Sequence, residues 1–250
     1  MTRTRRLAQA LALIPVIAVP AAAAAGDDPA ARYTACMERV ERDPRAAFDA
    51  AVTWEELGGG PPARHCQAKA LLAMDAPAEA AHRLQTLADS LAGRTAMRAD
   101  LLIQAGRAWL RADMLGQADR TLATARELAP DNATAATAHA TVLLAAGKDW
   151  EAVDALNAAL EAEPKDIGAL VLRATAYRYL DSPDLAAADI ERALTRDPDH
   201  PDALLERGIL HRLAGREQKA RDTWMTLIET HPDTPAAQAA RDQIAAMDGD

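Results

Sequence analysis

Four prolines in the second half of the chain recur at a fixed interval of 34 residues: Pro130, Pro164, Pro198 and Pro232. Proline cannot continue a helix, and the residue before it avoids the helical region of backbone space, so each proline predicts the end of a helix. A constant interval between such ends indicates one structural unit stacked on copies of itself. Units of this kind bury a core only against their neighbours, so the spacing constrains the fold to a repetitive array.

The residues between these prolines follow the same interval. A column of helix breakers, which divides each unit into two helical halves, consists of Asp113, Gly147, Asp181 and Gly215. Small residues recur in the first half at Gly106, Ala140, Ala174 and Gly208, and in the second half at Ala118, Ala152, Ala186 and Ala220. Bulky residues form a column at Leu122, Leu156, Ile190 and Trp224. The small columns allow two antiparallel helices to cross closely, and the bulky column fills the space beside the crossing.

This pattern resembles the tetratricopeptide repeat, a helix–turn–helix unit of 34 residues. The resemblance covers residues 99–232 as four copies, which begin near Ala99, Ala133, Ile167 and Pro201. It departs from the family at the early tryptophan, which is Leu102, Ala136, Leu170 or Leu204, and at an early leucine, which is replaced by Arg173 and Arg207. The resemblance implies an all-α fold, a right-handed α-α superhelical solenoid of helical hairpins.

The flanking sequence continues the helical pattern less regularly. Residues 61–98 are expected to form a degenerate repeat with four extra residues before Ala99, residues 26–60 an N-terminal helical pair that caps the array, and residues 233–250 a capping helix and tail. The Gly/Pro cluster at residues 58–62 is either a tight loop or a small hinge, and the return of the repeat pattern just beyond it favours the loop. Packing within or between repeats is expected for Trp54, Trp109, Trp150 and Trp224.

The first 25 residues have a different composition. Arg3, Arg5 and Arg6 precede an apolar run, and a row of alanines ends at Ala25. This order is typical of a bacterial-type secretory signal peptide, so residues 1–25 are expected to be cleaved on export to the periplasm. The alternative is an uncleaved membrane anchor, because residues 7–25 form a mostly apolar stretch of nearly spanning length. Two prolines and weakly hydrophobic alanines favour cleavage, and only the anchor would place the protein at a membrane.

Export changes how the two cysteines are interpreted. Cys36 and Cys66 both belong to the irregular N-terminal part. In an oxidising compartment an even pair is most simply a structural disulfide. The alternatives are two buried thiols that fill small gaps, or redox chemistry, which normally needs a closer Cys-x-x-Cys pair. We expect the disulfide.

In the tetratricopeptide family the first helices of the repeats line a concave groove. Carried onto this chain, the groove positions combine apolar side chains with Arg107, Arg111, Arg178, Tyr179 and Arg212. Arginine can bind a carboxylate through two parallel hydrogen bonds, so this combination predicts a protein or peptide partner with an acidic segment. Removal of the four arginines is then expected to abolish partner capture without lowering the melting temperature. The alternative is that these arginines are solvated or pair with acids of the chain itself.

Charge and motif content argue against other classes of function. The formal net charge is −9, and it falls to about −12 without the three arginines of residues 1–25, so nucleic-acid binding is not expected. The chain lacks the His-Glu-x-x-His, Gly-rich phosphate-loop and Gly-x-Ser-x-Gly motifs, and no metal or cofactor is expected. We therefore expect a non-enzymatic, exported scaffold or adaptor that binds its partner during assembly or maintenance of the cell envelope. The alternative is a periplasmic chaperone or accessory subunit for exported proteins, similar to the repeat proteins of cytochrome maturation.

Overall fold

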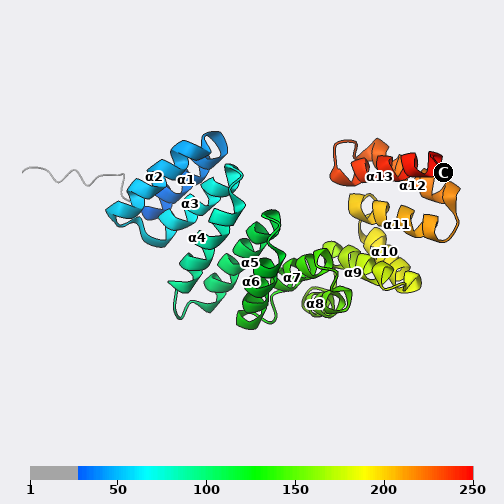
Figure 1. Cartoon of the computed structure of the whole chain (residues 1–250), viewed down its shortest axis with the longest axis horizontal. Helices are drawn as coiled ribbons and strands as arrows, with labels where there is room; N and C mark the ends of the chain where they lie inside the picture. The colour runs from blue at the N-terminus through cyan, green and yellow to red at the C-terminus, as the bar shows by residue number, and fades with distance from the viewer. Residues whose placement is uncertain (1–27, 250) are drawn as a thin grey trace, which may run out of the picture.

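The computed structural model describes residues 28–249, so the expected signal peptide lies outside the described residues. Over that range the regular structure is entirely helical (Figure 1). The helices are α1 (Pro29–Arg42), α2 (Pro44–Trp54), the π-helical turn η1 (Glu55–Gly59), α3 (Gly60–Ala73), α4 (Pro77–Asp89), α5 (Thr95–Arg111), α6 (Leu115–Leu128), α7 (Ala133–Ala145), α8 (Asp149–Ala162), α9 (Ile167–Tyr179), α10 (Pro183–Arg196), α11 (Pro201–Leu213), α12 (Glu217–Thr230) and α13 (Pro235–Asp248).

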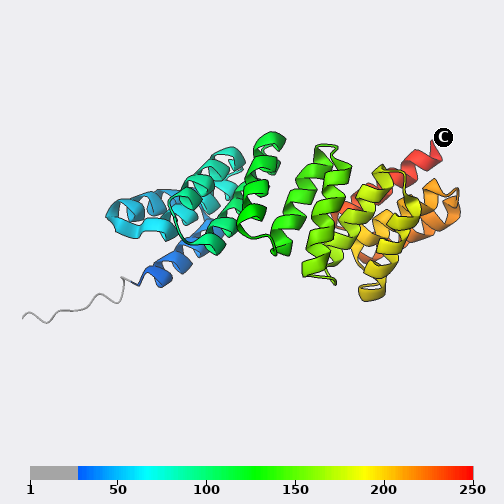
Figure 2. The same cartoon turned by 90° about the horizontal axis from the view of Figure 1, so that it is seen from below.

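Consecutive helices pair into hairpins that are stacked along the molecule, and α13 packs on the last hairpin (Figures 1 and 2). Along the four regular repeats the first helices contact one another, from α5 through α7, α9 and α11 to α13. Within residues 28–249 the second helices do not approach one another as closely. The first helices therefore lie on the inside of the curve that the array describes. The predicted fold class, an all-α superhelical solenoid of helical hairpins, is confirmed.

The turns inside the hairpins lie where the breaker column places them. Asp113, Gly147, Asp181 and Gly215 have left-handed φ angles of 57°, 69°, 53° and 70°. Glycine and aspartate are among the residues that visit this region most readily. The next N–H then donates to the carbonyl five residues earlier, as from Lys148 to Leu143 over 2.9 Å. This closure satisfies the free carbonyls of the helix end and fixes the reversal of the chain.

The turns between hairpins also follow from the sequence. Each helix that follows one of the four repeat prolines is capped by a side chain at its first turn. Asn132 accepts from the N–H of Ala135 (3.0 Å), and Asp166 accepts from the N–H of Ala169 (3.1 Å). His200 and Thr234 are in the same place before α11 and α13. Proline ends one helix and the cap begins the next, so the connections between hairpins are built in the same way.

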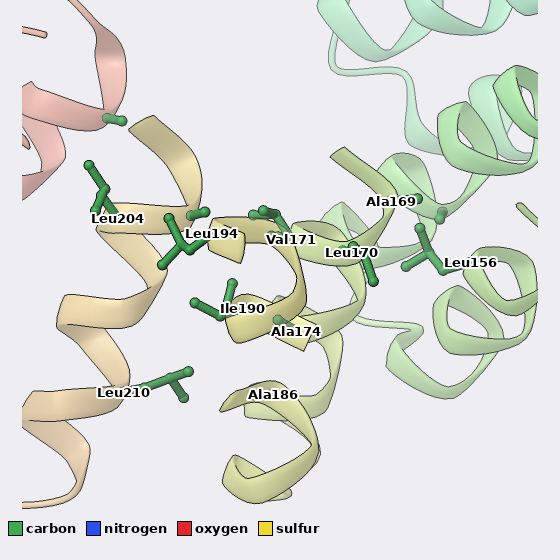
Figure 3. Packing of buried hydrophobic residues seen from close by; sticks show 14 of the residues in the cluster. Leu156, Ala169, Leu170, Val171, Ala174, Ala186, Ile190, Leu194, Leu204 and Leu210 are labelled. Carbon is green, nitrogen blue, oxygen red and sulfur yellow. The ribbon is translucent and has the colours of Figure 1, made fainter. Parts of the chain in front are cut away.

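The core forms where small residues face bulky ones. A Cβ atom on Gly208 would lie 2.1 Å from Nε1 of the fully buried Trp224, and one on Gly106 would lie 2.3 Å from Cγ of Leu122. Ala174, Ala186 and Ile190 are at most 1% exposed in the equivalent crossing of α9 and α10 (Figure 3). The small and bulky columns therefore mark the close contacts between first and second helices.

Two expectations at individual residues have different outcomes. The expectation for Trp150 is wrong, because its side chain is 66% exposed at the start of α8. Its column contains Gly116, Asp184 and Gln218 in the other repeats, so this position faces solvent. The cluster at residues 58–62 is a tight connection, with Gly58 at a φ of 90° and α2 packed directly on α3.

Of the described helices, none combines the length and the apolar character that a membrane span requires.

Candidate functional site

The inner face consists of the groove positions of α5, α7, α9 and α11, which are three or four residues apart and so share one side of each helix. It contains Ile103, Arg107, Leu110, Arg111, Thr137, Thr141, Leu144, Val171, Thr175, Arg178, Tyr179, Leu205, Ile209, Arg212 and Leu213. Of the five side chains predicted to bind a partner, Arg107, Arg111 and Tyr179 are exposed, whereas Arg178 and Arg212 are partly buried. These residues are distributed along the face and do not converge on one point.

Arg178 is engaged within the protein. Its Nε donates to Oε1 of Glu206 over 2.5 Å, which joins α9 to α11, and Glu206 is only 4% exposed. The guanidinium carbon of Arg178 also lies 4.4 Å from the centre of the Tyr179 ring. Removing one member of a buried ion pair leaves the other charge uncompensated and is strongly destabilising. The expectation that all four arginines can be removed without lowering the melting temperature therefore does not hold for Arg178.

The two arginines of α5 are more accessible. Nη2 of Arg111 lies 3.1 Å from Oδ1 of Asp75, and both side chains are exposed, so this ion pair contributes little to stability. Arg107 is exposed and forms no ion pair with the residues that the structure describes. Both guanidinium groups can therefore exchange solvent or a weak partner for a ligand carboxylate.

Arg212 occupies the position of Arg178 one repeat later, but it lacks the acid. Helix α13 begins at Pro235, 34 residues after Pro201, so Ala240 stands where the preceding repeat has Glu206. The Nε of Arg212 is buried and has no hydrogen-bond partner in the described chain. The last part of the inner face therefore carries a cation that the fold itself does not neutralise.

A pocket of about 530 Å³ lies at the N-terminal end of the array, between α3 and α5. The four extra residues lengthen the connection after α4 and add a turn to the start of α5, and α3 and α5 do not pack closely on each other. The lining is mainly apolar, and its side chains include Tyr33, Pro61, Leu91, Met97 and Leu101. The 38-residue interval from Pro61 to Ala99 was the sequence signal for this pocket, although sequence reasoning did not predict it.

A hydrogen-bonded chain crosses one side of this pocket. The hydroxyl of Tyr33 lies 2.7 Å from Nδ1 of His65, and Nε2 of His65 lies 3.0 Å from Oε1 of Gln104. Burial lowers the pKa of His65, although the bond to Gln104 opposes this, and burial raises the pKa of Tyr33. The neutral ring satisfies both contacts if Tyr33 donates to Nδ1 and Nε2 donates to Gln104. The chain connects α1, α3 and α5 without a net charge.

Cys36 and Cys66 form a disulfide in the structure, with their Cα atoms 6.4 Å apart. The bridge joins α1 to α3 within a small cluster that includes Val40, Ala47 and Ala70. The sequence contains no further cysteine. The predicted pairing is therefore present, and it ties the N-terminal helical pair to the degenerate repeat beside the pocket.

Sequence reasoning missed a set of polar links on the outer side of the first helices. Arg173 donates from Nε and Nη2 to the two carboxylate oxygens of Asp189 (2.7 and 2.8 Å) and from Nη1 to Asn157 (2.7 Å). One side chain of α9 thereby joins α8 to α10. The same repeat position contains Gln67, which donates to Glu55 (2.7 Å), and His139, which lies 2.7 Å from Asp119. The replacement of the family's early leucine by arginine was the available signal.

Comparisons with known proteins agree with this geometry. Residues 171–237 match the family model described as tetratricopeptide repeat. The Pseudomonas aeruginosa pilF protein superposes with a TM-score of 0.65 at 14% identity, over 86% of this chain and 97% of that one. A tetratricopeptide repeat protein from Parabacteroides merdae gives a TM-score of 0.61 at 20% identity, over 73% of this chain and 71% of that one. At these identities the likeness shows the fold alone.

Two further relatives are informative. YrrB, described as a TPR protein with an unusual peptide-binding site, gives a TM-score of 0.54 at 20% identity over 78% of this chain and 98% of that one. DnaJ homolog subfamily C member 3 of Rattus norvegicus is 28% identical over 106 residues, 42% of this chain. The chain spans only about a fifth (21%) of that protein.

Stacked helical hairpins with glycine and alanine at their crossings define a helical-repeat protein whose first helices form an inner surface. Residues 171–237 match the tetratricopeptide-repeat model, and the array as a whole has the fold of tetratricopeptide-repeat proteins. This fold serves as a scaffold for protein–protein interaction, and proteins of the family bind protein or peptide partners.

Proposed function

We propose that the protein is a non-enzymatic scaffold or adaptor that holds an acidic, partly apolar segment of a partner protein against its inner face. The observation that carries this proposal is the unpaired Nε of Arg212. Its counterpart Arg178 is neutralised by Glu206, whereas Ala240 occupies the position of Glu206 one repeat later. A cation in a partly buried position forms stronger charge-assisted hydrogen bonds than one in bulk water. An incoming carboxylate would supply the partner that the fold omits.

The rest of the inner face suits the same kind of segment. Leu144, Leu205 and Ile209 are partly buried and offer apolar contact between the arginines of α5 and α11. The chain as a whole carries a net charge of −9, so cations concentrated on one face would distinguish it from the remaining surface. Apolar side chains would supply contact area, and the arginines would set register and specificity.

We further propose that the protein acts in the periplasm, during assembly or maintenance of the cell envelope. The order of charged, apolar and small residues in positions 1–25 supports export. The disulfide between Cys36 and Cys66 supports an oxidising compartment, because such bonds persist poorly in a reducing cytosol. Detection of the mature chain in a periplasmic extract, with its N-terminus near residue 26, would support this location. Recovery of the full-length chain in the cytosol would contradict it.

A chaperone or accessory subunit for exported proteins is the second candidate. The pocket between α3 and α5 favours it, because an apolar opening of this size accepts a bulky apolar side chain of an extended segment. A chaperone should bind many unfolded chains and release them as they fold. An adaptor should remain bound to one folded complex, so the stability of the captured complex distinguishes the two.

Binding of a labelled peptide of alternating Glu and Leu, measured by fluorescence polarisation, tests the inner face. We expect Arg212→Gln to weaken binding roughly tenfold, the loss of one charge-assisted hydrogen bond. Ala240→Glu, which restores the missing acid, should weaken it similarly. The matched control Arg196→Gln changes the same charge at an exposed position of α10 and should have no effect. Equal binding by wild type, Arg212→Gln and Ala240→Glu would contradict the assignment.

A further inference from the structure

Arg207 is the counterpart of Arg173 one repeat later, and its acid is also missing. The residue that corresponds to Asp189 is Thr223, 34 positions further on. The hydroxyl of Thr223 donates to the carbonyl of Lys219 in its own helix over 2.8 Å. Arg207 is partly buried, and its Nε is shielded from solvent without a hydrogen-bond partner among the described residues. Because Asp189 binds Arg173 through both of its oxygens, the last hairpin has the same cation without its carboxylate.

His211 lies one helical turn beyond Arg207 and has the same deficiency. Its Nδ1 is buried and has no hydrogen-bond partner in the described chain. Burial lowers the pKa of His211, and the charges of Arg216, Arg207 and Lys219 lower it further, so all of these influences favour the neutral ring. Arg207 belongs to α11, Arg216 to the turn that follows and Lys219 to α12. All the charges that shift the pKa of His211 are therefore positive.

This cluster is separate from the inner face. Arg207 is two residues from Ile209, which turns it about 160° away around α11. Its counterpart Arg173 contacts α8 and α10, on the outer side of the array. Glu191 of α10 stands where Asn157 stands on α8, but it is exposed and forms no ion pair with Arg207 in the structure. A group that binds Arg207 would therefore approach between α10 and α12, away from a segment on the inner face.

We propose that Arg207 and His211, supported by Arg216 and Lys219, form a second binding site, which receives an Asp or Glu side chain of a protein partner on the outer side of the last hairpin. The ligand class follows from the fold's own precedent. One repeat earlier, a carboxylate carried on a helix occupies the equivalent place and binds its arginine in two-pronged fashion. The planar guanidinium matches the two oxygens of a carboxylate in this way, whereas a neutral amide offers only one acceptor oxygen.

The arginine Nε–H signals of the full chain, labelled with ¹⁵N-arginine, report the site directly. The probes are an alanine-based peptide with one central Glu, the same peptide with Gln, and inorganic phosphate. We expect the Glu peptide to shift the Arg207 signal saturably while the Arg173 signal stays in place, and the Gln peptide to shift neither. Absence of a shift at Arg207 would overturn the proposal, and saturation by phosphate at lower concentration than the Glu peptide would overturn the carboxylate assignment.

Two variants and a control make the test specific. Thr223→Asp supplies the internal carboxylate, so the Arg207 signal should move to its ligand-bound position without peptide and then stop responding. Arg207→Gln should remove the response through loss of the signal and lower peptide binding at least tenfold, whereas Arg196→Gln should change nothing. Circular dichroism melting establishes that each variant folds, and Arg207→Gln remains decisive if Thr223→Asp does not. A concentration-dependent dimer that Thr223→Asp abolishes would identify a second copy as the donor and overturn the assignment to a different protein.

Discussion

The hydroxyl of Tyr33 lies 2.7 Å from Nδ1 of His65, so the first helix of the N-terminal pair is hydrogen-bonded to the first helix of the degenerate repeat. The other ring nitrogen of His65 reaches Gln104 on α5 over 3.0 Å. One neutral imidazole thus spans three successive first helices at the point where the four-residue insertion separates α3 from α5. Because this ring links the three helices, its protonation should affect the stability of the N-terminal part.

The N-terminal part should become less stable as the pH is lowered, because of His65. Burial lowers the pKa of His65, so the folded state binds fewer protons than the unfolded state. The contribution is present in full above the ordinary histidine pKa of about 6.5, and it is lost as the pH falls from there toward the lower pKa of the folded state. Urea unfolding at pH 8 and pH 5 should show this loss, and His65→Gln should reduce it. His211, whose pKa is also lowered, acts in the same direction, so the same measurement on His211→Gln separates its contribution from that of His65. An unchanged pH dependence in His65→Gln would contradict the prediction.

Replacement of Arg173 and Arg207 by methionine should have unequal effects on the free energy of unfolding. Arg173→Met leaves the buried carboxylate of Asp189 without its main partner and should cost about 3–5 kcal/mol. Arg207→Met removes a cation that has no acidic partner among residues 28–249 and should change stability by less than about 1 kcal/mol in either direction. Chemical denaturation measures both. Equal losses would show that Arg207 has an internal partner and would argue against the outer carboxylate site.

Gly208 should not tolerate even one added methyl group. Its Cβ would lie 2.1 Å from Nε1 of Trp224, whose ring is fully buried and donates to the carbonyl of Leu205 over 3.1 Å. Gly208→Ala should therefore cost about 1–3 kcal/mol through overpacking, despite the higher helix propensity of alanine. The reverse change at the same column, Ala174→Gly, should cost only about 1 kcal/mol through backbone entropy and lost packing. A stabilised Gly208→Ala variant in thermal melting would show that the crossing can open.

Removal of the disulfide should destabilise only one end of the molecule. The bridge closes 30 residues, for which the chain-entropy model gives about 3–4 kcal/mol. Because each hairpin contacts only its neighbours, hydrogen exchange should accelerate in α1–α4 of the Cys36→Ala, Cys66→Ala double variant, while α9–α12 remain protected. Uniform acceleration over the whole array would instead indicate that the solenoid unfolds as a single unit.

The repeat interval predicts most of the fold, because each of its columns has one physical task. Asp113 and Asp181 were recognised as breakers, and both take the left-handed conformation that reverses the chain. Gly208 and Trp224 were assigned to small and bulky columns, and they meet at the crossing of α11 and α12. Packing of this kind is local and recurs in every copy. A single sequence therefore contains several independent examples of each small and bulky column.

The candidate site was less accessible to sequence reasoning, because its chemistry depends on pairs that differ between copies. Arg178 and Arg212 occupy the same column, yet Glu206 forms an ion pair with Arg178 only. The link from Arg173 to Asp189 also depends on geometry between helices, and the column of Arg173 alone does not reveal its partner. Comparison of one copy with the next, at the partner position as well as the arginine position, would have separated neutralised from free cations.

The most direct test of the scaffold assignment is site-specific photo-crosslinking in the intact cell. Leu213, 60% exposed on the inner face of α11, and Leu185, 52% exposed on α10, are matched positions for a photo-reactive amino acid. The protein labelled at Leu213 should crosslink to one defined partner, and Ala240→Glu should weaken this product, whereas labelling at Leu185 should yield no such product. Crosslinking of the same partner from Leu185 and not from Leu213 would contradict binding at the inner face.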